Sequence, residues 1–123
     1  MVTVDGDQSW HLEREVLDLI ADKWAMLIVN ALGPGTLRFT EIECHVRGIS
    51  HKMLAQTLRG LERHGIVSRF AHATVPPRVD YTLTESGRDL LAVAIQLCNW
   101  TKQYRHQIES ARSKFDRERG SLS

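Results

Sequence analysis

The sequence has few cysteines and no long apolar run, and both absences exclude classes of protein. Its two cysteines, Cys44 and Cys98, lack the CxxC spacing of a metal or redox pair, so we expect no disulfide scaffold. Apolar runs such as Trp24 to Val29 are far shorter than the roughly 20 residues that cross a bilayer. Because residues 1–9 include two aspartates and no apolar stretch, no secretory signal is predicted, and we expect a cytoplasmic protein.

The sequence also lacks the motifs of the common enzyme classes. It contains no glycine-rich phosphate loop, no nucleophile elbow and no convincing pair of carboxylates. His45, His51 and His64 do not share one helical face at the i, i+4 spacing of metal ligands, so no metal is predicted. We therefore expect neither catalytic activity nor a cofactor.

The net charge is only +1 at pH 7, but the basic residues are concentrated in the middle of the chain. Seven basic and four acidic side chains fall between Gly35 and Asp80, which leaves the rest of the chain net acidic. With 42% hydrophobic and 25% charged residues, the composition is that of one globular domain. The central basic segment is where we expect a nucleic acid to bind.

Apolar residues recur at helical spacing from Glu13 to Leu32, which predicts two helices that meet near residues 21–23. Gly33-Pro34-Gly35 is expected to end the second helix, because proline disfavours helix in the residue before it. Residues 36–39 then form a short extended piece.

A helix-turn-helix unit is predicted next. Its first helix begins with a capping box in which Thr40 caps the first turn and Glu43 reaches back, and Phe39 packs onto Cys44. This short helix ends near Val46-Arg47. The other signals are a turn at Gly48, a cap at Ser50 for a helix from Ser50 to His64, and a helix-ending glycine at Gly65.

Two strands and a long helix complete the expected fold. The strands are predicted from Ile66 to Phe70 and from Arg78 to Leu83, where apolar and polar residues alternate, and Thr84 caps a final helix to about Lys114. The result is a mainly α fold with a small β-hairpin, a winged helix-turn-helix. We interpret residues 1–10 as a flexible segment, 11–109 as the winged domain with its long final helix, and 110–123 as the helix end and polar tail.

The helix from Ser50 to His64 is expected to contact DNA through one of its faces. Leu54, Leu58 and Leu61 form an apolar stripe that packs inward, and the opposite face carries cations and an amide. Arg78 is stiffened by Pro76-Pro77 and suits a phosphate or the minor groove, although it also suits an ion pair with Asp80. The predicted DNA-binding residues are Arg38, Ser50, His51, Lys52, Gln56, Arg59, Arg63 and Arg78. Gln56 and Arg59 are expected to read bases, with Lys52 and Arg63 nearer the phosphates.

A second copy of the chain is the other expected partner. The final helix carries more apolar side chains than so small a domain buries, so a homodimer should cover them, with the first helix contributing. The predicted interface residues are Val16, Leu91, Ile95, Cys98 and Tyr104. Cys44 is expected to face the core.

The sequence resembles the HxlR-type helix-turn-helix regulators, relatives of the MarR winged-helix proteins. The resemblance covers about residues 11–105 and rests on Leu17-Asp18-Leu19-Ile20, Lys23-Trp24, Arg38-Phe39, Glu41-Ile42, Gly48-Ile49-Ser50, Leu54, Leu58, Leu61-Glu62, Gly65, Val75-Pro76-Pro77-Arg78-Val79, Tyr81, Leu83-Thr84, Gly87, Leu90 and Trp100. It implies a dimeric bacterial transcription factor of a kind that often responds to electrophiles, oxidants or small ligands.

One departure from this family concerns the signal. Many members carry a sensing cysteine followed by proline ahead of the first helix, and here those positions hold His11-Leu12. An imidazole cannot form a disulfide, so no thiol sensor is expected there. Control should then come from a small-molecule effector between the terminal helices and the winged domain, or from protein abundance.

We therefore expect a sequence-specific regulator that binds an inverted-repeat operator in double-stranded DNA as a homodimer. The alternative is a winged-helix module for protein docking or RNA binding, because fold alone does not determine function. A docking module would carry an apolar outer face on the helix from Ser50 to His64, and the side chains there are polar.

Overall fold

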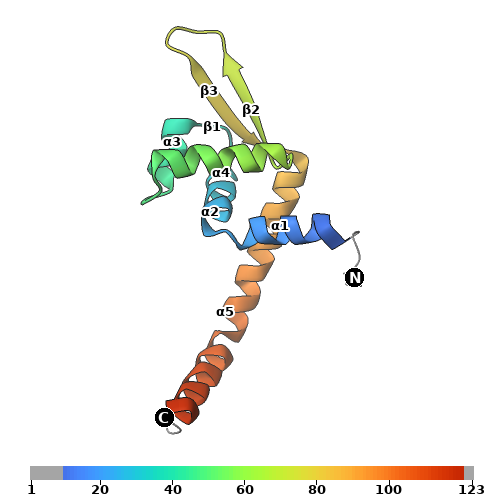
Figure 1. Cartoon of the computed structure of the whole chain (residues 1–123), viewed down its shortest axis with the longest axis vertical. Helices are drawn as coiled ribbons and strands as arrows, with labels where there is room; N and C mark the ends of the chain where they lie inside the picture. The colour runs from blue at the N-terminus through green and yellow to red at the C-terminus, as the bar shows by residue number, and fades with distance from the viewer. Residues whose placement is uncertain (1–9, 121–123) are drawn as a thin grey trace. The chain divides into compact units, whose positions relative to one another are not determined.

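The computed structural model describes residues 10–120, which divide into a first unit ending at Leu91 and a second unit beginning at Ala92. The predicted flexible segment, apart from residue 10, and the last three residues lie outside the described part. The elements are α1 (His11–Ala21), α2 (Lys23–Ala31), β1 (Leu37–Arg38), α3 (Phe39–His45), α4 (His51–Arg63), β2 (Val67–His72), β3 (Arg78–Leu83) and α5 (Glu85–Gly120) (Figure 1). This order is the predicted winged helix-turn-helix.

The break between α1 and α2 comes from a side-chain cap. Asp22 has an extended backbone, and its carboxylate accepts hydrogen bonds from the backbone N–H groups of Trp24 at 2.8 Å and Ala25 at 3.3 Å. These bonds satisfy donors that would otherwise be unpaired at the start of α2. The predicted junction at residues 21–23 is confirmed.

The start of α3 differs from the prediction. The helix begins at Phe39 and not after Thr40, and the backbone N–H of Arg38 donates to Oε1 of Glu41 at 2.9 Å. The reason is tertiary, because β1 pairs with β3 and its pairing holds the backbone extended up to Arg38. Thr40 therefore lies inside the helix. Phe39 is the first residue of the helix, so it does not precede the cap as the predicted staple onto Cys44 requires. It is half-buried, and its ring centroid lies 4.7 Å from that of His51.

The local signals around α4 are confirmed. Gly48 has a φ of 88° in the turn before the helix, a conformation that L side chains rarely adopt. The Ser50 hydroxyl oxygen accepts a hydrogen bond from the Met53 backbone N–H at 3.0 Å. After the helix, Gly65 has a φ of 72°, and its N–H donates to the Glu62 carbonyl at 3.0 Å.

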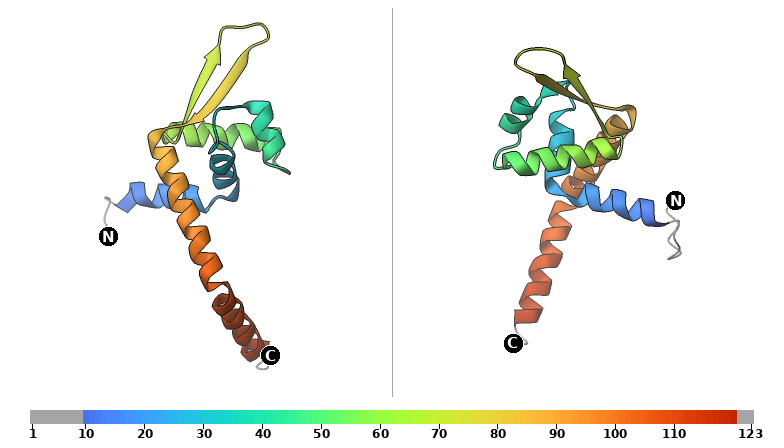
Figure 2. Two further views of the ribbon diagram at one scale, coloured as in Figure 1. Left: turned by 180° about the vertical axis from the view of Figure 1, so that it is seen from behind. Right: turned by 45° about the horizontal axis from the view of Figure 1, so that its top comes forward.

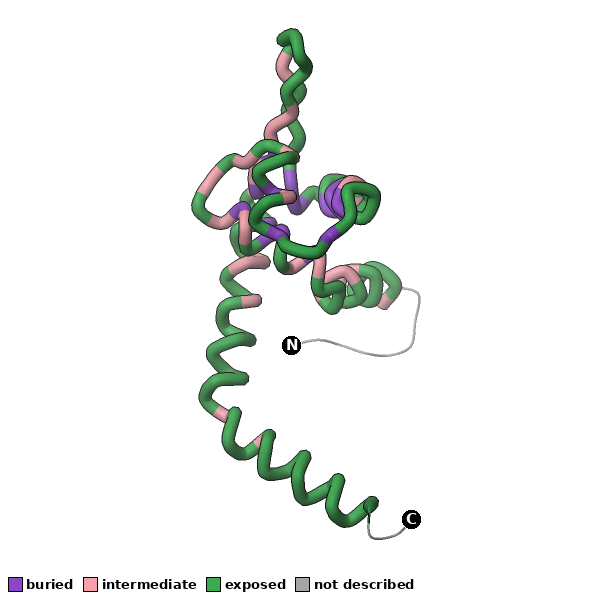
Figure 3. Tube along the Cα trace, turned by 90° about the vertical axis from the view of Figure 1, so that its left-hand side faces the viewer, coloured by how far each residue is buried: buried purple, intermediate pink, exposed green. Residues whose placement is uncertain are grey.

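The core of the first unit lies where α2, α3 and α4 pack together with the bases of the strands. Its largest fully buried side chains are Ile28, Val29, Leu32, Ile42, Leu54, Leu58, Leu61 and Val67. Figure 3 shows the buried positions gathered there and the hairpin tip exposed. Burying each such side chain contributes about 1.5–3 kcal/mol, so this cluster holds the helix-turn-helix in one arrangement.

The three strands form one antiparallel sheet in the order β1-β3-β2. Val67 pairs with Leu83 and His72 with Arg78, so β2 continues two residues past its predicted end at Phe70. The β2–β3 hairpin, which we call the wing, projects beyond the helices of the first unit (Figures 1 and 2). Because strand side chains alternate, Arg69 and Tyr81 share one face of the wing, and Phe70 and Asp80 share the other.

The last helix, α5, begins as predicted and ends later. The Thr84 hydroxyl accepts a hydrogen bond from the Gly87 backbone N–H at 3.2 Å, which caps the first turn. The helix continues to Gly120, past the expected end near Lys114. None of the helices within residues 10–120 is long and apolar enough to span a membrane.

Candidate nucleic-acid interface

Two opposite faces of α4 define the candidate site. Leu54, Leu58 and Leu61 are at most 1% exposed, which confirms the predicted inward stripe. On the opposite face Lys52, Gln56, Arg59 and Arg63 are all exposed. The helix thus presents three cations and one amide, the groups that contact phosphates and base edges.

The first residues of α4 are engaged in local contacts. Ser50 is the helix cap. The ring of His51 is tilted by 55° against that of Phe39, and its Nδ1 lies 3.6 Å from Oε2 of Glu43. Ser50 and His51 are both exposed, so these contacts orient the start of α4 without burying it.

A cleft of about 330 Å³ lies between α4 and the wing. It is lined by Ala55, Arg59, Glu62, Arg69 and Tyr81, and we call it the α4–wing cleft. Arg59 therefore lies at the edge of the outer face, next to the sheet. Arg69 was not among the predicted site residues, because its orientation depends on the register of the hairpin, which the loop at 73–77 does not determine.

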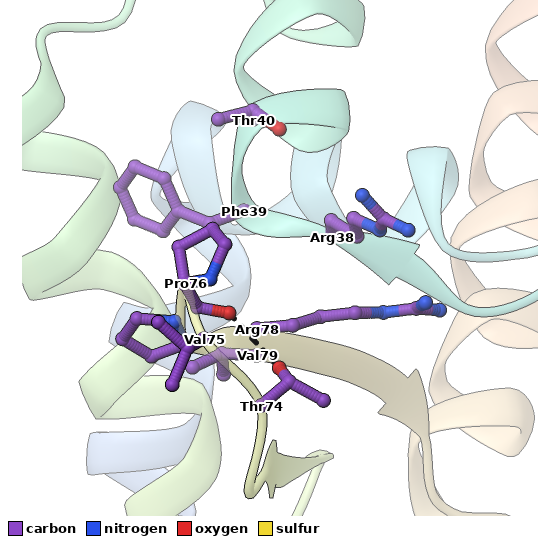
Figure 4. A pocket seen from close by; sticks show the side chains of 9 residues that line it. Arg38, Phe39, Thr40, Thr74, Val75, Pro76, Arg78 and Val79 are labelled. Atoms are coloured by element: carbon purple, nitrogen blue, oxygen red, sulfur yellow. Dashed lines mark hydrogen bonds between the residues drawn. The ribbon is translucent and has the colours of Figure 1, made fainter.

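A second cleft, of about 500 Å³, lies between the start of α3 and the wing loop. It is lined by residues 38–40 and 74–79. Figure 4 shows the side chains of Arg38 and Arg78 extending in the same direction in this cleft. The structure thus brings together two residues that the sequence predicted as DNA contacts.

Arg78 belongs to a polar cluster on the wing. Its Nε lies 3.1 Å from Oδ1 of Asp80, and Nε2 of His72 lies 2.8 Å from Oδ2 of the same carboxylate. The ion pair that the sequence left as an alternative is therefore present. The Arg78 side chain is still 45% exposed, so part of the guanidinium remains accessible to a phosphate.

This cluster makes Asp80 a source of pH-dependent stability. The hydrogen bond from Arg78, and after it the one from His72, lowers the pKa of the Asp80 carboxyl below its ordinary value of 3.8. Because the pKa is lower in the folded state, the ionised carboxylate stabilises the fold above pH 3.8, and this contribution disappears as the pH falls below that value.

We therefore expect Asp80→Asn to destabilise the protein at pH 7 and to have much less effect at about pH 3. Urea unfolding of the variant and the wild type at both pH values measures the difference. Asp89→Asn is the control, because Asp89 is exposed and forms no ion pair within residues 10–120. An Asp80→Asn effect that is equal at both pH values would contradict this account.

The structure corrects the prediction for Cys44, which is exposed and does not face the core. Ile42 and Val46 are buried one helical turn apart, and Cys44 stands about 200° around the helix from Ile42. Cys98 is exposed as well. Within residues 10–120, no three His, Cys, Asp or Glu side chains gather closely enough to hold a metal ion.

The predicted dimer residues fall in both units, which we describe separately. Val16 on α1 and Leu91 at the end of the first unit are half-buried. In the second unit Ile95 and Cys98 are exposed and Tyr104 is half-buried.

Comparison with known proteins identifies relatives along most of the chain. The family model for HxlR-like helix-turn-helix proteins matches residues 19–109. An HTH-type transcriptional regulator from Methanothermobacter thermautotrophicus is 38% identical over 110 residues, which cover 89% of this chain and 84% of the relative.

Solved structures of similar proteins share the fold. The transcriptional regulator YtfH from Salmonella typhimurium is 37% identical, with a TM-score of 0.71 over 82% of this chain and 90% of that one. The redox regulator HypR in its reduced form is also 37% identical, with a TM-score of 0.71 over 80% of this chain and 97% of that one.

Proposed function

Because this chain belongs to the HxlR-like helix-turn-helix family of DNA-binding transcriptional regulators, we propose that it binds an inverted-repeat operator as a homodimer. In this proposal α4 of each subunit enters the major groove, and the wing contacts the neighbouring backbone or minor groove. The observation that carries the proposal is the division of α4 into a fully buried leucine stripe and an exposed face of three cations and Gln56.

The chemistry of the exposed α4 face supports sequence recognition. Gln56 is the one amide on that face, and an amide side chain forms a bidentate pair with adenine in the major groove. Lys52 and Arg63 suit phosphate contacts on either side of it. The side chains opposite the leucine stripe are polar, which favours DNA over the protein-docking alternative.

The second subunit is required by the expected operator symmetry. A two-fold homodimer presents two α4 helices about 34–36 Å apart, one turn of B-DNA, which corresponds to an inverted repeat. Arg38 and Arg78 at the wing loop are then in a position to contact phosphates outside each half-site.

We expect selection from random duplexes to yield an inverted repeat whose half-site centres are about 10–10.5 base pairs apart. Gln56→Ala should relax the preference at one position of each half-site, at a cost of about 1–3 kcal/mol for the base contact. Lys52→Ala should instead weaken binding to all sequences alike.

Gln103→Ala is the matched control, since Gln103 is an exposed glutamine on α5. It should leave the selected motif unchanged. The proposal fails if the wild type selects no motif, or if Gln56→Ala and Gln103→Ala select the same one as the wild type.

A further inference from the structure

The α4–wing cleft combines residues from three elements. Arg59 and Glu62 come from α4, Arg69 from β2 and Tyr81 from β3. Arg69 and Tyr81 are direct partners in the β2–β3 register, so both side chains lie on the sheet face toward α4. Tyr81 is 8% exposed and forms the floor, while Arg59, Glu62 and Arg69 are exposed around it.

The cleft has a net positive charge without internal ion pairs. Neither the Arg59 nor the Arg69 side chain forms a hydrogen bond or an ion pair within residues 10–120, in contrast to the Arg78 side chain, which is paired with Asp80. Two guanidinium groups thus face one carboxylate, that of Glu62, in the same cleft. The planar donor fork of arginine matches the oxygens of a phosphate, so the chemistry of the cleft favours a phosphate group.

We propose that the α4–wing cleft binds one phosphodiester group of the DNA backbone, held jointly by Arg59 and Arg69. This inference rests on the proposed function, in which α4 occupies the major groove and the wing reaches beyond it. The strand that separates the two grooves then passes between α4 and the wing, where the cleft lies. Arg59 accordingly contacts the backbone and not a base, which leaves Gln56 as the base-reading residue.

Glu62 has a defined role in this arrangement. Its carboxylate offsets the repulsion between the two guanidinium groups in the free protein, and it opposes a phosphate when DNA arrives. Removing that charge with Glu62→Gln should therefore tighten DNA binding severalfold. A residue with a purely structural role would not produce this gain.

The test uses the full-length protein and its selected operator, with a neutral methylphosphonate replacing one phosphate at a time. For the wild type, affinity should fall at the linkages that the protein contacts. Arg69→Ala should weaken binding to the unmodified operator about tenfold or more. At the linkage that joins the major-groove half-site to its flanking sequence, a methylphosphonate should no longer reduce the affinity of this variant. The slope of the salt dependence should fall by about one for each phosphate that the variant no longer neutralises.

Arg14→Ala is the charge-matched control, since Arg14 is exposed and belongs to α1, a helix of the first unit that lies away from the wing (Figure 1). It should keep the wild-type sensitivity at every linkage. The inference is overturned if Arg69→Ala also keeps that sensitivity. The proposed function would survive this result, because the selected motif and the effect of Gln56→Ala on it test that function separately. Titration with inorganic phosphate tests whether the cleft binds a free anion instead of the DNA backbone. If phosphate binding depends on Arg69 while Arg69→Ala leaves the methylphosphonate pattern unchanged, the cleft is a small-anion site.

Discussion

Replacing Gly87 with alanine is expected to destabilise the first unit by about 3 kcal/mol, although alanine is the better helix former. Gly87 is buried in the first turn of α5, and a Cβ there would overlap the backbone carbonyl oxygen of Ile66. That carbonyl accepts hydrogen bonds from the Thr84 backbone N–H and hydroxyl, both at 3.1 Å. Moving the first turn of α5 away would therefore strain or break the bonds that join it to the start of the wing.

The sign of this effect follows from comparing two magnitudes. The helix-propensity gain from glycine to alanine is about 1 kcal/mol, whereas overpacking against a fixed backbone costs about 1–3 kcal/mol, and each broken hydrogen bond adds about 1 kcal/mol. A flexible side chain would rotate aside, but a hydrogen-bonded carbonyl cannot. The steric cost should therefore exceed the gain.

Gly60→Ala provides the matched control. Gly60 lies inside α4, and a Cβ at this position would meet nothing within 4 Å. The substitution should stabilise the protein by about 0.5–1 kcal/mol. Urea unfolding of both variants measures the two changes, which should have opposite signs. Equal stability of Gly87→Ala and wild type would contradict the close approach of α5 to residue 66.

Local chemistry made much of this fold predictable. The turn at Gly48, the caps at Ser50 and Thr84 and the left-handed Gly65 each depend on residues only a few positions away. The leucine stripe of α4 followed from helical periodicity in the same way. Such signals determine where helices begin and end and which face they bury, and the structure confirms them.

The features that the sequence analysis predicted wrongly or missed depend on contacts between distant segments of the chain. The start of α3 is set by the pairing of β1 with β3, which lies far later in the chain, and a local capping motif at Thr40 cannot reveal that pairing. The exposure of Cys44 depends on which side of α3 packs into the core, and that side carries Ile42 and Val46. Arg69 enters the candidate site only through the hairpin register opposite Tyr81.

The part of α5 in the second unit has an exposed apolar side, which we expect to form the dimer interface. At about 100° per residue, Val93, Leu97 and Trp100 fall on one side of the helix, and all three are more than half exposed. The exposed polar residue Asn99 stands about 200° around the helix from Leu97. An amphipathic helix gains most of its stability from packing of its apolar face, so a second copy of this chain is the partner that we propose for it.

Leu97→Asp is expected to convert the dimer to a monomer and to reduce operator affinity by about a hundredfold or more. A charged side chain at the centre of the apolar side would have to be buried without a partner, which favours dissociation. A monomer binds one half-site at a time, so it loses the increase in affinity of about 10²–10⁴-fold that two linked binding sites provide. Sedimentation measures the subunit association, and titration of the full operator and of an isolated half-site measures binding.

Asn99→Asp introduces the same side chain about 200° around the helix from Leu97 but only about 40° from the exposed Ile95, so it distinguishes the two apolar sides of this helix. An interface centred on Leu97 should leave this variant dimeric with wild-type affinity. Affinity of Leu97→Asp for the isolated half-site should also match the wild type, because α4 and the wing are intact in the first unit. The combination of a monomer, a weakened full operator and an unchanged half-site separates loss of the partner from loss of folding. A Leu97→Asp protein that stays dimeric would place the subunit interface on another surface of the chain.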